Sequence, residues 1–449
     1  MANKILVLTV GTNPLPSYVV GKYLNNYDKL VLIHSEKKDY QKGTYDYAQK
    51  IKSGLEKYSE KTDYFFIKLE NVSDPKEIRR DLKNGINACL CFKDQNEIEE
   101  IHLNYTGGTK TMAVHIYNFF KENYNDKLKA SYLDARNYKL VFEDGTVEPS
   151  GKKDLRDYVK ISIDELLQLH LYKKCEENSL DIKQKYKFKN EFGADNFEKI
   201  SHQIEYIVKN EKSKDFTKWL SDVFRKVFKN GNDILRSKRK FIEHIEKISE
   251  KVARFDNETP DFVKDLLKAF PEKNRIIDEK QGLWRPGDDI NNHQLEKRIK
   301  PVVEFLNGRW LEWYIYSQTE SELLSMPNEL QEGEQFGLSL EARKASRENT
   351  TEFELDMFVL YGYQLIGISV TTAEKRGTCK LKGFEVIHRV KQIGGDESKA
   401  ILVTGLGSGT KSLEDDLAYE TGSAEGKIKV FGIEDWKDIG KKIVQEVFK

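Results

Sequence analysis

The segment Thr-Gly-Gly-Thr-Lys at residues 106–110 has the composition of an anion-binding turn. An apolar run ends at Leu103 and apolar residues at helical spacing begin at Met112, so the pattern predicts a strand, a tight turn and a helix. The glycines let the backbone approach a ligand, the first helical N–H groups point outward, and Thr109 and Lys110 add a hydroxyl and a cation. The alternative is an ordinary connection with a threonine cap.

A second group of chemically capable residues lies near the carboxyl end. After a polar loop, residues 352–360, which contain Glu-Leu-Asp ending at Asp356, and residues 364–371 read as the two strands of a hairpin. Lys382, Glu385 and Arg389 follow at i, i+3 and i+7, which places them on one face of a predicted helix. A divalent cation that assists phosphodiester cleavage takes hard oxygen ligands, and it needs more than one carboxylate. Asp356 alone is therefore a poor metal site.

The elements that must position the glycine turn alternate between strand and helix patterns over the first 150 residues. Such repetition predicts a mostly parallel, doubly wound sheet, in which ligands bind at the carboxyl ends of the strands. The loop from Gly11 to Pro16 and the turn from Thr106 to Lys110 both follow predicted strands, so we expect them to converge on one site. The predicted strands are residues 4–10, 29–34, 64–69, 99–105, 129–134 and 138–143.

Two loop sequences in this region carry a family resemblance. Val-Gly-Thr-Asn-Pro after the first strand, together with Tyr-Thr-Gly-Gly-Thr-Lys at residues 105–110, resembles CARF domains, the sensor modules of type III CRISPR ancillary proteins. The resemblance implies a Rossmann-like sensor domain over residues 1–152 that binds a cyclic oligoadenylate across a homodimer. A ring of phosphates suits two Lys110 side chains and two helix N-termini, and its symmetry suggests cyclic tetra-adenylate. The implied ligand-binding residues are Gly11, Thr12, Asn13, Pro14, Thr106, Gly107, Gly108, Thr109 and Lys110.

Residues 153–299 carry long, charge-rich helical patterns and are expected to form a helical connector that transmits the allosteric signal. Arg239 and His244 in this segment have the Arg-x4-His spacing of HEPN ribonucleases, in which the two side chains act on RNA without a metal. The simpler interpretation is a solvated helix face, because further basic residues surround the pair.

Residues 300–449 show the element order of the PD-(D/E)xK nuclease core: helix, strands, helix and strand. Gly-Arg-Trp-Leu-Glu at 308–312, the Glu-Leu-Asp strand and the Gly-Gly turn at 394–395 resemble the nuclease half of CARF-fused nucleases. The resemblance implies a restriction-endonuclease-like α/β domain. The chain departs from the family pattern where Ser369-Val370-Thr371 replaces Glu-x-Lys, and the two hydroxyls there can assist only by hydrogen bonding.

Carboxylate migration from this strand to the following helix is known in the superfamily. The resemblance then implies that Asp356 and Glu385 hold Mg²⁺ or Mn²⁺, with Glu312 in support and Lys382 or Lys380 in place of the strand lysine. The alternative is a set of surface ion pairs on an inactivated domain.

The composition sets further limits. A chain of 449 residues accommodates two or three domains, and 74 basic against 74 acidic residues confine any nucleic-acid contact to a local patch. Four scattered cysteines fit a reducing cytoplasm, and nothing in the chain predicts a membrane segment. The stretch 405–412 approaches a Walker pattern but has Thr410 in place of a glycine, and we expect a flexible loop there.

Together these patterns predict a cytoplasmic homodimer in which cyclic oligoadenylate binding controls metal-dependent cleavage of single-stranded RNA or DNA. Two alternatives stay open: a metal-independent HEPN-type ribonuclease that uses Arg239 and His244, and a ligand-binding regulator without catalytic activity. The sequence leaves open the choice between RNA and DNA, the ring size of the activator and whether the sensor degrades it.

Overall fold

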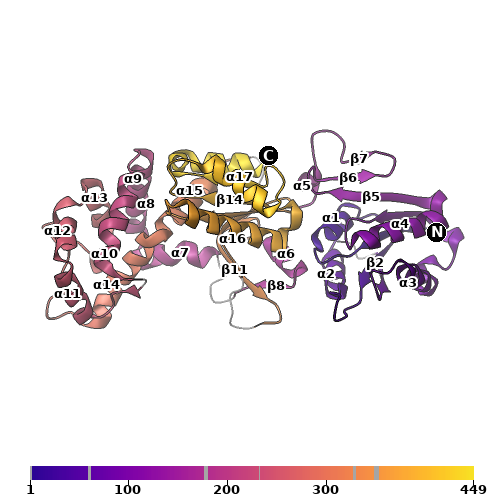
Figure 1. The fold of residues 1–449 in the computed structure, drawn as a ribbon, viewed down its shortest axis with the longest axis horizontal. Helices are drawn as coiled ribbons and strands as arrows, with labels where there is room; N and C mark the ends of the chain where they lie inside the picture. The colour runs from indigo at the N-terminus through magenta and orange to yellow at the C-terminus, as the bar shows by residue number, and fades with distance from the viewer. Residues whose placement is uncertain (1–2, 59–61, 176–180, 232, 327–329, 348–352) are drawn as a thin grey trace.

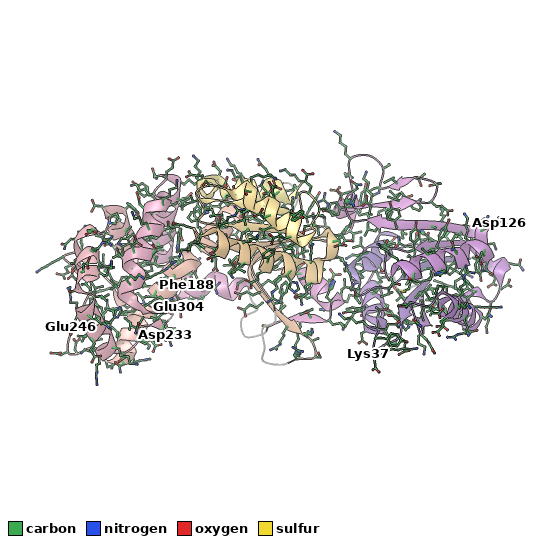
Figure 2. The ribbon with its side chains drawn as sticks, in the orientation of Figure 1. Lys37, Asp126, Phe188, Asp233, Glu246 and Glu304 are labelled. Carbon is green, nitrogen blue, oxygen red and sulfur yellow. The ribbon has the colours of Figure 1, made fainter. Side chains whose placement is uncertain are left out.

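The computed structural model describes residues 3–58, 62–175, 181–231, 233–326, 330–347 and 353–449. Three regions lie in a row along its long axis: an N-terminal sheet domain, a C-terminal sheet domain in the middle, and a helical region (Figure 1). Asp126 lies at the sensor end of the row and Glu246 at the helical end (Figure 2). No helix in the described part of the chain is long and apolar enough to cross a bilayer.

The N-terminal domain is built on a seven-stranded sheet with the order β3-β2-β1-β4-β5-β6-β7. The strands from β3 to β5 run parallel, and β6 and β7 add an antiparallel edge. The continuous apolar run of β1 is buried, as expected for a strand covered on both faces. The strands are β1 (Asn3–Thr9), β2 (Lys29–Ser35), β3 (Asp63–Leu69), β4 (Ile98–Asn104), β5 (Leu128–Asp134), β6 (Lys139–Phe142) and β7 (Val147–Glu148).

Helices cover both faces of this sheet, which confirms the predicted Rossmann-like fold. Helices α1 (Leu15–Tyr23) and α2 (Tyr45–Leu55) pack on one face, whereas α3 (Pro75–Ala88) and α4 (Lys110–Tyr124) pack on the other. The chain leaves the neighbouring strands β1 and β4 toward opposite faces. The carboxyl ends of these two strands therefore form the crevice in which doubly wound sheets bind ligands.

A short segment joins the two sheet domains. It contains α5 (Leu155–Tyr158), α6 (Ile163–Leu169) and the strand β8 (Tyr172–Lys174). β8 pairs antiparallel with β11 (Phe336–Lys344) and so forms the edge of the C-terminal sheet. The beginning of the predicted connector thus belongs to the C-terminal sheet.

The C-terminal domain contains a six-stranded mixed sheet with the order β15-β14-β13-β12-β11-β8. The predicted hairpin is confirmed, because β12 and β13 pair antiparallel with Tyr361 opposite Gln364. α16 and α17 pack on one face of the sheet, and α15 and α18 pack on the other. The elements are α15 (Trp310–Leu324), β12 (Phe353–Tyr361), β13 (Gln364–Val370), α16 (Arg376–Gly394), β14 (Lys399–Val403), α17 (Thr410–Thr421), β15 (Ile428–Phe431) and α18 (Ile439–Val447).

Strand β11 is an element that the sequence analysis missed. Its residues were expected to lie in a polar loop before the hairpin, yet Phe336 to Ala342 are buried between β8 and β12. The charged residues Glu341 and Arg343 conceal the strand in the sequence, because they interrupt its apolar run.

The helical region does not lie between the N-terminal and C-terminal domains. Helices α8 to α14 occupy the end of the molecule opposite the N-terminal domain, so the expected connector is an outer region (Figure 1). Phe188 and Glu304 lie near its junction with the C-terminal domain (Figure 2). Its elements are α7 (Asp181–Phe192), α8 (Ala194–Lys209), α9 (Ser213–Trp219), α10 (Arg225–Phe228), β9 (Lys229–Asn230), β10 (Asp233–Ile234), α11 (Lys238–Lys247), α12 (Ser249–Glu258), α13 (Asp261–Ala269) and α14 (Asn292–Glu304).

Two apolar cores connect the three regions. One core extends from α1 and α2 of the sensor through α6 to α16 of the C-terminal domain, and it includes Tyr18, Leu166 and Val386. The other joins the helical region to α15, α18 and the opposite face of the C-terminal sheet. Since protein cores are closely packed, α1, α2, α6 and α16 form one continuous packing unit.

Candidate ligand and catalytic sites

The two predicted ligand loops meet at the carboxyl ends of β1 and β4. These strands are parallel neighbours with Leu8 beside Asn104. A Cβ atom on Gly107 would lie 2.0 Å from the Thr9 carbonyl oxygen, and one on Gly11 would lie 2.7 Å from the Gly108 nitrogen. The Thr9 hydroxyl also donates to the Gly107 carbonyl at 2.7 Å. The glycines are therefore required because backbone lies against backbone.

The turn presents the N-terminus of α4 to solvent. The Thr109 hydroxyl caps the helix by accepting from the Met112 N–H at 3.2 Å. Thr109 and Lys110 are exposed, as are Gly108 and, on the opposing loop, Thr12. Exposed N–H groups, a hydroxyl and a cation at a helix N-terminus form a site suited to an anion.

Other residues assigned to ligand binding have structural contacts. Thr106 turns inward, where its hydroxyl donates to Asn104 Oδ1 at 2.8 Å and accepts from the Leu133 N–H at 2.6 Å. Pro14 is buried at the start of α1. Thr106 and Pro14 therefore shape the loops from within.

Asn13 faces the junction between the domains. Its Oδ1 accepts from the Leu15 N–H at 3.2 Å and lies 3.2 Å from Nε2 of His170, at the end of α6. Its amide also covers Gly395, because a Cβ atom there would lie 2.0 Å from Asn13 Nδ2. Gly395 follows α16 directly and has a positive φ of 61°. One side chain thus links the ligand loop, the joining segment and the end of α16.

The candidate catalytic site lies at the other end of α16, where β12 and β13 carry polar groups. Asp356 Oδ2 accepts hydrogen bonds from the Ser369 hydroxyl at 3.0 Å and the Val370 N–H at 2.7 Å. Both bonds end on the same oxygen, and no described residue donates a hydrogen bond to Oδ1. Ser369 faces the site as predicted, and it holds Asp356 in place.

Glu312 of α15 extends the acidic surface of this site. Its carboxylate accepts from the Arg309 guanidinium at 2.5 Å. Burial raises the pKa of Glu312 to about 7, the nearby Arg309 opposes the shift, and the negative charges of Asp356 and Glu354 add to it. Burial and the same Asp356 charge also raise the pKa of Glu354. Glu312, Glu354 and Asp356 therefore lie within electrostatic range of one another, with Arg309 as the cation that pairs with Glu312.

The structure distinguishes between the two candidate lysines. Lys382 donates to Glu385 at 3.0 Å. Partial burial opposes its positive charge, but Glu385, Asp356 and Glu354 together raise its pKa. Lys380 instead donates to Glu420 of α17 at 2.6 Å. Lys382 is thus the lysine that the fold places in the field of the acidic site.

Asp356 and Glu385 both carry the hard oxygen donors that Mg²⁺ or Mn²⁺ takes. Glu385 is exposed and pairs with Lys382 of its own helix, and none of the described contacts joins it to Asp356. Mg²⁺ is commonly held by one or two carboxylates, with water and substrate phosphate completing the shell. Asp356 Oδ1 accepts no hydrogen bond from a described residue, whereas Glu312 is paired with Arg309. Among the described residues there is no group of three or more His, Cys, Asp or Glu side chains placed to hold a metal. The oxygen donors of Asp356 suit such an ion in their chemistry, and its pairing with Glu385 stays a prediction.

The remaining candidate motifs are not brought to a common site. Arg239 forms an exposed ion pair with Glu243 at 2.8 Å, while His244 Nε2 lies 2.8 Å from the carbonyl oxygen of Lys226. Five residues of helix separate Arg239 and His244 by about 140° around the axis. The stretch 405–412 is a strand-to-helix turn, not a loop throughout, because α17 begins at Thr410.

Arg309 and Gly395 are the functional candidates that the sequence analysis did not single out. Arg309 lies three residues before Glu312, and that spacing on a helix is a signal for an ion pair. Gly395 belongs to the predicted Gly-Gly turn, but its contact with Asn13 is not visible in the sequence.

Comparisons with known proteins agree with this architecture. Residues 5–165 match the family model described as the Card1 CARF domain. The N-terminal domain is therefore a CARF domain, as the loop motifs predicted. A comparison with curated proteins gave no match.

Two solved structures share the fold over nearly the whole chain. Protein VC1899 from Vibrio cholerae superposes with a TM-score of 0.61 at 16% identity, covering 98% of this chain and 97% of that one. Can2 from Sulfobacillus thermosulfidooxidans, solved with cyclic tetra-adenylate, has a TM-score of 0.58 at 16% identity and covers 99% of each chain. At this identity the likeness establishes the fold.

Proposed function

We propose that this protein is a nuclease of type III CRISPR defence that is activated by a cyclic oligoadenylate and depends on Mg²⁺ or Mn²⁺. The observation that carries the proposal is the position of Lys382 in the field of Asp356, while it is hydrogen-bonded to Glu385. In this proposal, Asp356, Glu385 and Lys382 stand in for the absent Glu-x-Lys.

The sensor half of the proposal rests on the CARF domain and its exposed turn. Thr109, Lys110 and the N-terminus of α4 offer donors to phosphate oxygens. Can2, which has the same fold, was solved with cyclic tetra-adenylate, and this ring is the activator that we propose here. Two copies of the chain related by a two-fold axis would present the turn twice to such a ring.

In the proposed mechanism, Asp356 and Glu385 would hold the metal ion, and the hydrogen bonds from Ser369 and Val370 fix the orientation of Asp356. A bound Mg²⁺ or Mn²⁺ supplies Lewis-acid stabilisation of the phosphate and lowers the pKa of a water molecule. Lys382 holds a positive charge beside the carboxylates, where it can orient the attacking water. Glu312 and its partner Arg309 support the site from α15.

Activation requires that the ligand favour one arrangement of the two domains over another. Asn13 supports such coupling, because it lies between the ligand loop and Gly395 at the end of α16. The same helix carries Lys382 and Glu385. We propose that α16 transmits a change in the loop to the catalytic residues.

Cleavage of labelled single-stranded RNA and DNA tests the proposal. We expect cleavage only with cyclic tetra-adenylate and Mn²⁺ or Mg²⁺, and none in EDTA. Cleavage in EDTA that is lost in His244→Ala would favour the HEPN-type ribonuclease. Tight binding of the ring without cleavage under any metal condition would favour a regulator.

A further inference from the structure

A cavity lies between the helical region and the carboxyl edge of the C-terminal sheet. Its volume is about 440 Å³, within the range of cavities that bind small ligands. Arg225 and Ser221 line it from the helical region, and Thr371, Thr372 and Thr378 line it from the C-terminal domain. Most of these side chains are hydrogen-bond donors.

Arg225 brings a positive charge to the cavity without a counterion. Its Nη2 donates to the Thr372 hydroxyl at 3.3 Å, and its Nε is buried without a hydrogen-bond partner. Within the described residues, no carboxylate lies at ion-pair distance from Arg225. Burial alone lowers its pKa. A buried polar group without a partner is costly, so this guanidinium would be stabilised by an anion.

The N-terminus of α16 opens on the same cavity. Lys375 stands at its cap position without a side-chain hydrogen bond to the helix, and Thr378 in the first turn lines the cavity. The first N–H groups of a 19-residue helix carry partial positive charge. Glu374 is the one carboxylate among the lining residues, and the Thr217 hydroxyl donates to it at 3.3 Å.

The position of the cavity relates it to the candidate catalytic site. Thr371 and Thr372 directly follow Ser369 and Val370, the residues that hold Asp356. An anion beside Arg225 would therefore lie next to the proposed cleavage site. A single-stranded nucleic acid carries phosphates at regular intervals and can occupy both places at once.

We propose that this cavity binds one nucleotide of the substrate strand next to the cleaved bond, with its phosphate on Arg225 and the N-terminus of α16. The inference rests on the proposed nuclease function and names the helical region as part of the substrate site. Arginine suits this role because its planar fork of donors matches phosphate oxygens.

Binding of a labelled mixed-sequence single-stranded oligonucleotide to the full chain tests this site without cleavage. The measurement uses Asp356→Asn protein with cyclic tetra-adenylate at several salt concentrations. Arg225→Ala is expected to weaken binding about tenfold and to reduce the slope of log K against log salt by about 0.7, the value for one phosphate contact. Arg225→Lys should retain part of the affinity.

Arg254→Ala is the matched control, since it removes the same charge from an ion pair with Glu258 in the same region. It should leave both affinity and slope unchanged. An unchanged salt slope in Arg225→Ala would overturn the proposal, whether or not the variant is less stable. An oligonucleotide that binds through Arg225 but is never cut by Asp356-containing protein would contradict the nuclease function and leave the binding site standing.

Discussion

The two candidate sites occupy equivalent positions on their sheets but are built from opposite chemistry. The sensor site lies at the carboxyl ends of β1 and β4 and consists of glycines, N–H groups, hydroxyls and Lys110. The other site lies beside the carboxyl end of β13 and gathers Asp356, Glu354 and Glu312. One site suits an anion directly, whereas the other would meet a phosphate only after it has bound a cation.

The two sites also place different demands on the backbone. At the sensor site Gly107 lies so close to Thr9 that no other residue fits, and the function comes from the main chain. At the acidic site Ser369 and Thr371 stand where the family pattern has Glu-x-Lys, and the proposed substitutes, Glu385 and Lys382, lie on the next helix. A site made of side chains can move between elements, but a site made of main chain cannot.

The largest effect is expected at the acidic site. Asp356→Asn and Glu385→Gln should each reduce cleavage by about 10³-fold, because several kcal/mol of transition-state stabilisation are lost. Affinity for cyclic tetra-adenylate, measured by calorimetry, should stay the same. Lys380→Ala is the control, and its cleavage rate should change by less than about twofold. Full activity in Glu385→Gln would remove the basis for placing the second carboxylate on α16.

A smaller effect is expected at the sensor site. Lys110→Ala should weaken the binding of cyclic tetra-adenylate by about tenfold, since one charge-assisted hydrogen bond contributes about 1.5–3 kcal/mol. Lys121→Ala on the same helix is the control, because Lys121 already pairs with Glu143 at 2.7 Å. Calorimetry at low and high salt measures both variants. Equal affinity in wild type and Lys110→Ala would show that the turn does not contact the ring through this lysine.

The junction between the two sites should respond to a single added methyl group. Gly395→Ala would place a Cβ atom 2.0 Å from Asn13 Nδ2, at a backbone φ of 61° that strains any other residue. We expect activation by the ring to fall by about fivefold while cleavage still requires metal. Combining Gly395→Ala with Asn13→Ala should recover part of the lost activation. A double-mutant cycle measures this coupling between the two residues. Independent effects of the two substitutions would contradict coupling through this contact.

The smallest effect concerns stability at the same junction. Burial raises the pKa of Glu397 from 4.5 to about 7, and the neighbouring Asp396 adds to the shift. The folded protein therefore retains a proton that the unfolded chain releases between these pH values, so stability falls as the pH rises through this window. Glu397→Gln should raise the melting temperature by a few degrees at pH 8.5 and leave it unchanged at pH 4.5. The same difference at both pH values would exclude titration of Glu397 as its cause.

Local patterns in the sequence were sufficient for much of the fold. The apolar run 4–10 became β1, and the segments 352–360 and 364–371 became the hairpin of β12 and β13 within one or two residues. These predictions succeed because strand periodicity and turn residues act over short distances. Periodicity did not predict β11, because neighbouring strands bury it although its sequence contains charged residues.

The candidate sites, too, could be predicted from the sequence only in part. The sequence by itself determined the glycine turn, the helix that follows it and the shared helical face of Lys382 and Glu385, since spacing along one element fixes which side chains lie together. Only the tertiary structure decided that the charge of Asp356 acts on Lys382 while Lys380 pairs with α17, that the helical region lies beyond the C-terminal domain, and that Asn13 contacts Gly395. These relations depend on how separate elements pack, and residues far apart in the chain carry no local signal of the partner they will meet.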